Sequence, residues 1–436
     1  MTLKEHLRKN IVLSLPVIIG QLGHIMVGVA DSIMVGRLGV IPLAAATFAG
    51  TIYHILMLFG IGVSYAITPK VAAADVKNSS KLLRYLQDGF FMNLGLGLIL
   101  FALGYFASHF LQYFGQEVPV AKAAGPYLVI MCGSLIPLMI FQTFRQYAEG
   151  LSDTFSPMIV SVFANLLNVF FNYMLIYGKL GAPALGLNGA GIATLMARVL
   201  MFALMIWWIR KKCTGFEWKF KWEGIKELLR IGVPSGMQYV FEVGAFATAA
   251  IMVGWISAEA LAAHNIALNL AAISYMAATG LAAASTIRIG NQMGLKDRRN
   301  LRIAGFSSFG LVTIFMGTCA MIFILFRNQL PALYIENEAV QQMASVLLII
   351  AAAFQISDGV QAVGLGVLRG LQDVKIPTII TFVSYWLIAI PTGYVFAFIL
   401  DWGVNGVWYA LSLGLTIAGM FNMWRFNRLS KKIKFV

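Results

Sequence analysis

Long apolar stretches recur along the chain, and charged or polar residues separate each stretch from the next. A helix needs roughly 20 apolar residues to cross the hydrocarbon core of a membrane. The connections between the stretches are short, and the longest polar one runs from Arg210 to Arg230. The pattern predicts twelve transmembrane helices, near residues 11–36, 43–68, 86–111, 126–148, 157–178, 188–210, 233–256, 260–287, 302–326, 341–368, 376–400 and 404–427.

The composition supports a chain that lies mostly in lipid. Of the 436 residues, 59% are hydrophobic and 11% are charged, whereas soluble proteins carry about 25% charged residues. The mean hydropathy is +0.80. The three cysteines are scattered along the chain, so neither a disulfide framework nor a zinc site is expected. Disordered and collagen-like proteins are excluded as well.

The charge is unevenly distributed between the loops. Lys and Arg total 32 against 18 acids, which gives a net charge of +14. If the N-terminus is cytoplasmic, almost every basic residue falls on the cytoplasmic side, and the other side receives only Arg37, Lys122, Lys179 and Arg327. The positive-inside rule then predicts that both termini lie in the cytoplasm. We therefore read the excess of base as topology and expect no nucleic acid partner.

The two halves of the chain resemble each other. Shifting the numbering by half the chain length places Pro16 on Pro234 and Thr68 on Thr286, and nearly the same shift aligns Gly150–Pro157 with Gly370–Pro377. A nearly constant offset that includes Pro and Asp positions indicates an internal repeat. Each repeat has six spans, so both enter the membrane in the same orientation. This predicts two parallel bundles, a site between them, and alternating access.

Fifteen of the 18 acids lie in loops or at the ends of predicted spans, and the remaining three are the main candidates for function. Asp31 is in the first span, Glu242 in the seventh and Asp358 in the tenth. A charge at the centre of a span costs roughly 2.5–3.5 kcal/mol on insertion scales, so such residues are retained for pairing, contact with water or function. We favour function for all three carboxylates.

Amides and one histidine share helix faces with these carboxylates at spacings of three or four residues. Amide oxygens can coordinate a cation, and amides also join helices by hydrogen bonds. For a single amide both interpretations stand, and for His24 we favour a hydrogen-bonded core residue over a ligand. Arg198 in the sixth span is either an internal counter-ion or a snorkelling side chain. The polar positions predicted to line the cavity are Asn168, Asn172, Gln238, Gln355, Gln361, Asn265 and His24.

These residues suggest an ion-coupled transport mechanism. Burial disfavours the charged form of a carboxylate, which lets it exchange protons, and nearby amides would let it bind sodium. A cationic substrate would compete for the same charge, and competition in a two-bundle scaffold gives antiport. A membrane enzyme is disfavoured because the five histidines form no HExxH spacing and the chain has no DDxxD motif. An uncoupled channel would not need carboxylates at these places.

With these motifs the chain resembles the MATE (multidrug and toxic compound extrusion) family, and its NorM-like bacterial branch in particular. The resemblance covers essentially the whole length. The segments that carry it are Pro16–Gly39, Asn168–Gly178, Pro234–Gly254, Ala262–Asn269, Arg288–Gly294 and Arg369–Pro377.

The resemblance implies an all-α membrane protein with two six-helix bundles around a V-shaped central cavity. It implies a cation-coupled antiporter that exports cationic drugs and toxic organic compounds, and a lipid-linked oligosaccharide flippase is the alternative in the same superfamily. Glu242 and Asp358 match the carboxylates that handle the coupling ion, sodium or a proton, and would bind sodium in a sodium-coupled protein. Asp31, with Asn168 and Asn172, matches the polar cluster of the first bundle.

The expected organisation follows from the spans and the resemblance together. We expect an N-terminal bundle at residues 1–210, a cytoplasmic basic linker at 211–230 and a C-terminal bundle at 231–436. The chain is expected to be a multi-pass protein of the bacterial inner membrane, a monomer surrounded by membrane lipids, with small cationic or amphipathic substrates and no cofactor beyond the coupling ion.

The repeat predicts that the two halves do different jobs. The offsets place Asp31 on Ala249, Glu242 on His24 and Asp358 on Leu138, so the ionisable positions are not equivalent. We expect Asp31→Asn and Glu242→Gln to reduce transport and ion binding in different proportions, with ion coupling in one half and substrate or proton handling in the other. Parallel measurements of efflux and of ion binding test this, and equal losses in both variants would contradict it.

Overall fold

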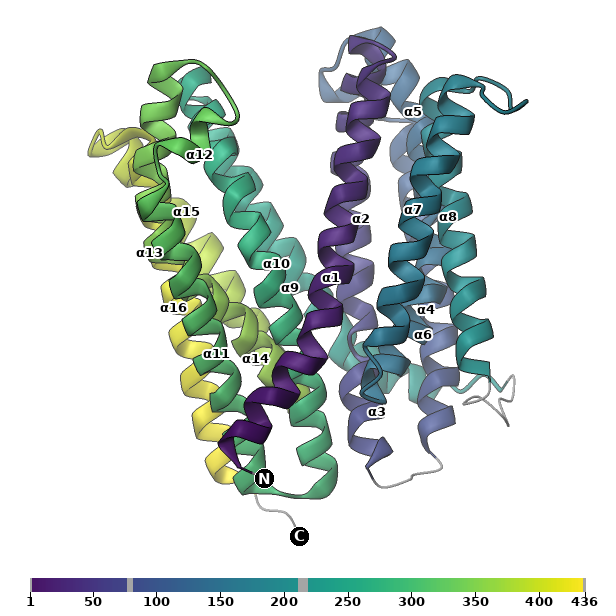
Figure 1. The fold of residues 1–436 in the computed structure, drawn as a ribbon, viewed down its shortest axis with the longest axis vertical. Helices are drawn as coiled ribbons and strands as arrows, with labels where there is room; N and C mark the ends of the chain where they lie inside the picture. Colours follow the sequence, from purple (N-terminus) through teal and green to yellow (C-terminus); the bar gives the residue numbers. More distant parts are fainter. Residues whose placement is uncertain (1, 77–80, 211–218, 434–436) are drawn as a thin grey trace. The chain divides into compact units, whose positions relative to one another are not determined.

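The computed structural model describes residues 2–76, 81–210 and 219–433, and helices make up almost all of this part of the chain (Figure 1). The π-helical segments η3 (Val383–Ala389) and η4 (Val395–Ile399) flank α15, and η1 (Leu111–Phe114) is a short 3-10 turn. The α-helices are α1 (Leu3–Gly36), α2 (Val40–Ser64), α3 (Ile67–Asp75), α4 (Lys81–Ser108), α5 (Val118–Gly133), α6 (Leu135–Gly150), α7 (Phe155–Tyr177), α8 (Gly186–Ile209), α9 (Trp222–Gly254), α10 (Ala258–Leu295), α11 (Arg298–Leu325), α12 (Gln329–Ala332), α13 (Glu338–Gly370), α14 (Lys375–Phe382), α15 (Ile390–Tyr394) and α16 (Gly403–Lys432).

The twelve predicted spans are confirmed. The described residues contain twelve helical stretches that are long and apolar enough to cross a membrane. Three of these stretches are built from several pieces: α2 with α3, α5 with α6, and the run from α14 to η4. The last run contains Pro391, which lacks a backbone N–H, and π-helical turns lie on both sides of it. The all-α class predicted from the sequence is therefore confirmed.

The helices group into two compact units. One unit consists of Ile19–Gly236, and the other consists of Met1–Ile18 together with Met237–Val436. In the first unit α7 packs on α8 and α4 packs on α6. In the second unit α10 and α16 both pack on α13. The helix crossings include close backbone approaches at glycine, as is common in membranes.

The internal repeat is visible in backbone hydrogen bonds. After α6 the Asp153 N–H donates to the Ala148 carbonyl at 2.9 Å, and after α13 the Asp373 N–H donates to the Leu368 carbonyl at 2.9 Å. Side chains repeat too, because Thr68 donates to the Gln146 carbonyl at 3.2 Å and Thr286 donates to the Gly366 carbonyl at 2.9 Å. These pairs are separated by the same offsets that align the two halves of the sequence. The scaffold was therefore duplicated down to individual contacts.

Two segments belong to the compact unit of the other repeat. The start of α1 packs in the C-terminal unit, where Asn10 Nδ2 donates to the hydroxyls of Ser307 and Ser308 at 3.1 and 3.0 Å. The start of α9 packs in the N-terminal unit, where Lys70 and Glu227 form an ion pair at 2.5 Å. The chain passes between the units inside α1 and inside α9, at two points that are again half a chain length apart.

These units divide the chain differently from the predicted bundles, which follow the order of the spans. The bundles at 1–210 and 231–436 place residues 1–18 with the first repeat, whereas their contacts lie with the second. Part of the predicted linker, residues 222–230, is helical and opens α9. Residues 211–218 of the linker lie outside the described residues.

Helices α10 and α13 cross so closely at Gly366 that one added methyl group there should destabilise the protein. A Cβ on Gly366 would lie 2.4 Å from the Ala282 carbonyl oxygen, which is a backbone atom and cannot move aside as a flexible side chain can. We expect Gly366→Ala to destabilise the protein by about 1–3 kcal/mol, the usual cost of overpacking, and to lower its melting temperature in detergent. Gly317→Ala on α11 is the matched control, since its Cβ would meet nothing within 4 Å. An unchanged melting temperature for Gly366→Ala would contradict this packing.

Candidate functional site

Glu242 is buried in the C-terminal unit and is held by two donors. It lies on α9 and is 7% exposed. The Tyr275 hydroxyl donates to Glu242 Oε1 at 2.7 Å, and Gln361 Nε2 donates to Oε2 at 3.3 Å. Helices α9, α10 and α13 therefore converge on this one carboxylate. Both bonds come from neutral groups, so they orient the carboxylate without neutralising it.

Asp358 lies on α13 and shares this buried region. It is also 7% exposed, and it makes no hydrogen bond or ion pair within the described residues. Its charge interacts electrostatically with that of Glu242, and both act on the Tyr385 hydroxyl. Two buried carboxylates repel each other unless they share a proton or a cation. The resemblance implied a shared ion site for these two residues, whereas no spacing in the sequence connects α9 with α13.

Amide oxygens without partners accompany the two carboxylates. Gln355 and Gln361 stand one turn before and one turn after Asp358 on α13, and both are buried. The Gln355 amide and the Gln361 oxygen have no hydrogen-bond partner among the described residues. Buried polar atoms normally have a partner, and these amide oxygens are able to act as ligands of a cation. Oxygen ligands of this kind suit a hard cation such as sodium.

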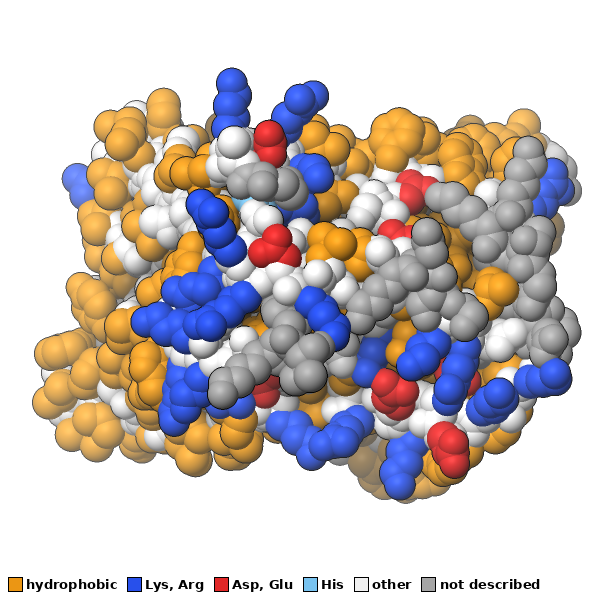
Figure 2. Space-filling model, turned by 90° about the horizontal axis from the view of Figure 1, so that it is seen from below, with side chains coloured by type: hydrophobic (Ala, Val, Ile, Leu, Met, Phe, Trp, Pro, Cys, Tyr) orange, Lys and Arg blue, Asp and Glu red, His pale blue; other side chains and the backbone are white. Residues whose placement is uncertain are grey.

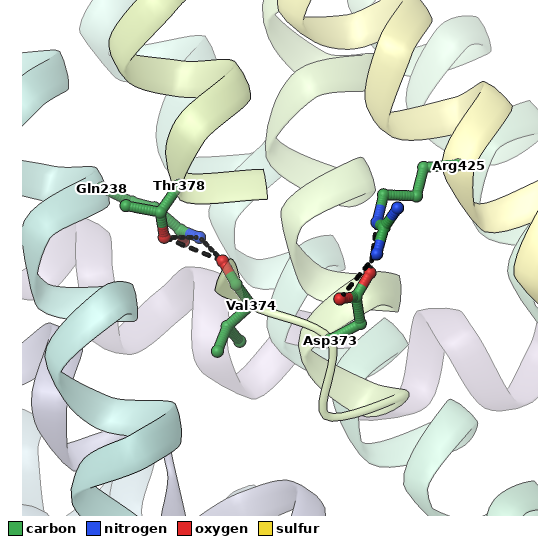
Figure 3. A network of polar contacts seen from close by, with 5 residues as sticks. All are labelled: Gln238, Asp373, Val374, Thr378 and Arg425. Carbon is green, nitrogen blue, oxygen red and sulfur yellow. Dashed lines mark hydrogen bonds and ion pairs between the residues drawn. The ribbon is translucent and has the colours of Figure 1, made fainter. Parts of the chain in front are cut away.

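Gln238 is held in a different arrangement. Its Nε2 donates to the Thr378 hydroxyl at 3.0 Å and to the Val374 carbonyl at 3.4 Å, so it joins α9 to the start of α14 (Figure 3). The Asp373–Arg425 ion pair fixes the same loop to α16. Gln238 therefore has a helix-joining role in this structure, although its oxygen is buried without a partner in the described part of the chain.

The N-terminal unit contains the predicted cluster around Asp31. Asn172 on α7 donates to Asp31 Oδ1 on α1, and its Nδ2 lies 3.3 Å from the Asn168 side-chain oxygen. With the Asn168 amide turned over, its nitrogen lies 3.1 Å from Asp31 Oδ1, which gives the carboxylate a second donor. The Tyr177 hydroxyl donates to the Met34 carbonyl at 2.8 Å and holds α7 against α1. Asp31, Asn168 and Asn172 are thus brought together.

Two predicted cavity residues are not joined to any carboxylate. His24 on α1 and Asn265 on α10 are exposed, and neither makes a side-chain hydrogen bond within the described residues. Neighbouring His264 is instead buried, and its Nδ1 accepts a hydrogen bond from Trp408 Nε1 at 3.0 Å. A role in the cavity for His24 and Asn265 stays a prediction, as does the function of the whole predicted site set.

Arg198 does not snorkel to the membrane surface. Its side chain is buried, NH1 donates to the Ser134 hydroxyl at 2.6 Å, and the guanidinium lies 5.2 Å from the centre of the Tyr53 ring. It also interacts electrostatically with Asp31. Of the two alternatives left by the sequence, an internal counter-ion near Asp31 is the one that this position supports.

Sequence reasoning missed three groups that form polar contacts between or within the helices. Tyr275 lies far from Glu242 along the chain and on another helix, and no spacing rule connects a tyrosine to a carboxylate in that way. Asp88 and Glu149 lie at the ends of predicted spans, and the structure shows that both are buried. Each pairs with an arginine four residues earlier, at 3.4 and 2.7 Å. An acid that follows Arg by four residues was the available signal for these two pairs.

Comparison with known proteins identifies the family. The family model MatE matches residues 16–174 and again residues 234–395, which together make up most of the chain. The two matches begin half a chain length apart, so they confirm the repeat found by self-comparison.

Relatives and solved structures match the full length. The chain is 34% identical over 441 residues to the probable multidrug resistance protein NorM of Rhizobium meliloti (strain 1021), covering 98% of this chain and 94% of that protein. It is 33% identical over 440 residues to the multidrug resistance protein MdtK of Yersinia pseudotuberculosis serotype O:1b (strain IP 31758), covering 98% and 96%.

Two solved structures show the same fold. The Vibrio cholerae MATE transporter VcmN in its bent form matches with a TM-score of 0.88 at 18% identity over 98% of each chain. The eukaryotic MATE transporter AtDTX14 matches with a TM-score of 0.86 at 19% identity over 99% of this chain and 98% of that one. The chain therefore belongs to the MATE family of membrane transporters, and it is a multi-pass protein of the bacterial inner membrane.

Proposed function

We propose that this chain is a multidrug efflux antiporter, which exports cationic and amphipathic organic compounds in exchange for sodium or protons. The observation that carries the proposal is the pair of buried carboxylates, Glu242 and Asp358, beside unpaired amide oxygens in a twelve-span transporter. Such a site holds negative charge that a proton, a metal cation or an organic cation can neutralise. The NorM and MdtK relatives are described as multidrug resistance proteins.

The exchange follows from competition for negative charge. With the carboxylates ionised and empty, an organic cation is attracted to the protein, and its aromatic parts find apolar and aromatic side chains. When a proton or sodium binds, the negative charge disappears and the cation is held less tightly. If the two ligands favour different conformations of the scaffold, alternating access couples their movements in opposite directions.

The coupling ion is cargo and no further cofactor is proposed. Sodium would be held by Glu242 and Asp358, with oxygens from Gln355 and Gln361 as additional ligands. A proton would instead be shared by the two carboxylates. We infer that Asp31 with Asn168 and Asn172 forms a second polar site in the other unit, where Arg198 offsets part of its charge.

Other aspects of the proposal follow from composition and family. We propose a transporter without enzymatic activity, acting as a monomer among membrane lipids and without a nucleic acid partner. The multidrug relatives favour drug export over the flippase alternative. A flippase for pyrophosphate-linked lipids would also need several basic residues deep within the spans, whereas Arg198 is the basic residue that the sequence predicts there.

Dye efflux from proteoliposomes tests the coupling role of the carboxylates. We expect ethidium efflux in the wild type under an imposed sodium or proton gradient. Glu242→Gln and Asp358→Asn should each reduce the gradient-driven rate about tenfold or more, equivalent to about 1.4 kcal/mol of lost interaction. The control is Glu338→Gln, since Glu338 is an exposed acid in the first turn of α13. Efflux driven by neither gradient would overturn the antiporter proposal.

The Tyr275 hydroxyl should tune the affinity for the coupling ion. Hydrogen bonds to charged groups contribute about 1.5–3 kcal/mol, and Tyr275→Phe removes the shorter of the two bonds to Glu242. Without this donor the ionised, empty carboxylate is less stable, so we expect the variant to need about tenfold less of the driving cation for half-maximal efflux, with a similar maximal rate. Tyr409→Phe on α16 is the control because that ring is exposed. An unchanged half-maximal concentration for Tyr275→Phe would contradict this role.

A further inference from the structure

Basic side chains from two helices meet at one end of the C-terminal unit. The first turns of α11 and the last turns of α16 lie together, joined by hydrogen bonds from Arg298 Nε to the Ser430 carbonyl at 3.2 Å and from Arg302 NH1 to the Ser430 hydroxyl at 2.8 Å. We call this surface the α11–α16 basic patch. Its members are Arg298, Arg299, Arg302, Arg425, Arg428, Lys431 and Lys432.

The patch keeps a net positive charge. Within the described residues only Arg425 has a carboxylate partner, Asp373, at 2.5 Å. Arg302 is bonded to neutral groups of Asn427 and Ser430, which leave its charge uncompensated. Asp297 borders the patch, where hydrogen bonds from Asn300 lower its pKa, so it contributes one negative charge at neutral pH. Two acids against seven basic side chains leave the surface cationic.

Exposed aromatic side chains lie next to the basic residues of the patch. The Arg428 guanidinium lies 5.3 Å from the centre of the Trp424 ring, and Arg302 lies 5.3 Å from that of Phe306. Trp424 is 53% exposed, and Phe421 and Met420 are exposed one turn further along α16. This order of charge, aromatic ring and apolar side chain is typical of the border between lipid headgroups and hydrocarbon. Figure 2 shows Lys and Arg side chains gathered directly beside hydrophobic ones on this end of the molecule.

The first repeat carries a related arrangement. Arg210, which follows α8, lies 5.3 Å from the centre of the Trp207 ring. Trp207 aligns with Trp424 at the same offset that aligns the first residues of α8 and α16. A tryptophan with a stacked arginine thus occurs at the same end of the last helix in both repeats. This independent occurrence supports a location of the patch at a membrane surface.

We propose that the α11–α16 basic patch binds the phosphate headgroup of an anionic phospholipid, with its acyl chains along the exposed apolar side chains of α11 and α16. Uncompensated guanidinium groups suit a phosphate. The adjoining apolar surface requires a ligand that is itself amphipathic, which an anionic phospholipid is and a soluble polyanion is not. The proposal concerns the lipid contact and is independent of the coupling ion.

Tryptophan quenching by brominated lipid gives a local test. The protein is placed in phosphatidylcholine nanodiscs with a minor fraction of phosphatidylglycerol, and only one of the two lipids carries brominated acyl chains. The part of the quenching that Trp424→Phe removes reports the lipid at the patch, since phenylalanine keeps the aromatic contact to Arg428. We expect brominated phosphatidylglycerol to quench this part more than its share of the bilayer predicts, and the preference to fall as salt is raised.

Two sets of variants distinguish lipid binding at the patch from a general effect of surface charge. The triple variant Arg298→Gln, Arg428→Gln, Lys431→Gln should reduce the preference for phosphatidylglycerol about tenfold. The charge-matched control Lys221→Gln, Lys226→Gln, Arg230→Gln removes three exposed bases of the other unit and should leave the preference unchanged. If the triple variant fails to fold, the single variant Lys431→Gln and the salt titration of the wild type carry the test, with a smaller decrease expected.

Three results would overturn the proposal. One is quenching of the Trp424 component in simple proportion to lipid abundance. Another is an equal loss of preference in the triple variant and in its charge-matched control. The third is displacement of phosphatidylglycerol by inorganic phosphate at constant ionic strength, which would identify a site for free phosphate rather than for a lipid.

Discussion

Removing a carboxylate from water carries a free-energy cost that has to be offset locally, and this constraint orders the polar contacts of the protein. Asp88 and Glu149 are offset by arginines on the same helix, and Asp31 by amides and by the charge of Arg198. Glu242 receives two neutral donors, whereas Asp358 has no partner in the described part of the chain. Neighbouring groups compensate the charges of Glu242 and Asp358 least, and this pair is therefore best suited to bind and release a cation.

The repeat supplies a rigid frame for this asymmetry. Equivalent turns follow α6 and α13, and Thr68 and Thr286 bind equivalent carbonyls. Contacts of this kind depend on the backbone and on small side chains, so both copies retained them. Ionisable positions were free to differ, and the offsets place Glu242 on His24 and Asp31 on Ala249. One scaffold thus carries two different sets of ionisable groups.

The crossing of the chain between units has a mechanical consequence. The two units are linked inside α1 and α9, and each helix begins with contacts in one unit and continues in the other. Pro16 and Pro234 lie just before the two crossing points, and proline removes a helix hydrogen bond. Weakened helices at both links are a suitable place for bending in a protein that alternates between conformations.

Much of the fold could be predicted from the sequence, because the bilayer allows few solutions. The span pattern predicted the number of helices and the constant offset predicted the repeat, and both are confirmed. The orientation that the basic loops predict stays a prediction. Spacings of three and four residues on one helix face also found the Asp31 cluster in part, since Asn168 and Asn172 are one turn apart.

Only the tertiary structure decided which helices meet. It brought Tyr275 to Glu242, directed Gln238 to Thr378, buried Arg198 and placed the start of α1 in the unit of the second repeat. The reason is physical: hydropathy and local periodicity act within one helix, whereas contacts between helices depend on shape and on glycines such as Gly366. The lipid-facing sides of all the helices are similarly apolar, so the sequence of a single span does not specify which helix packs against it.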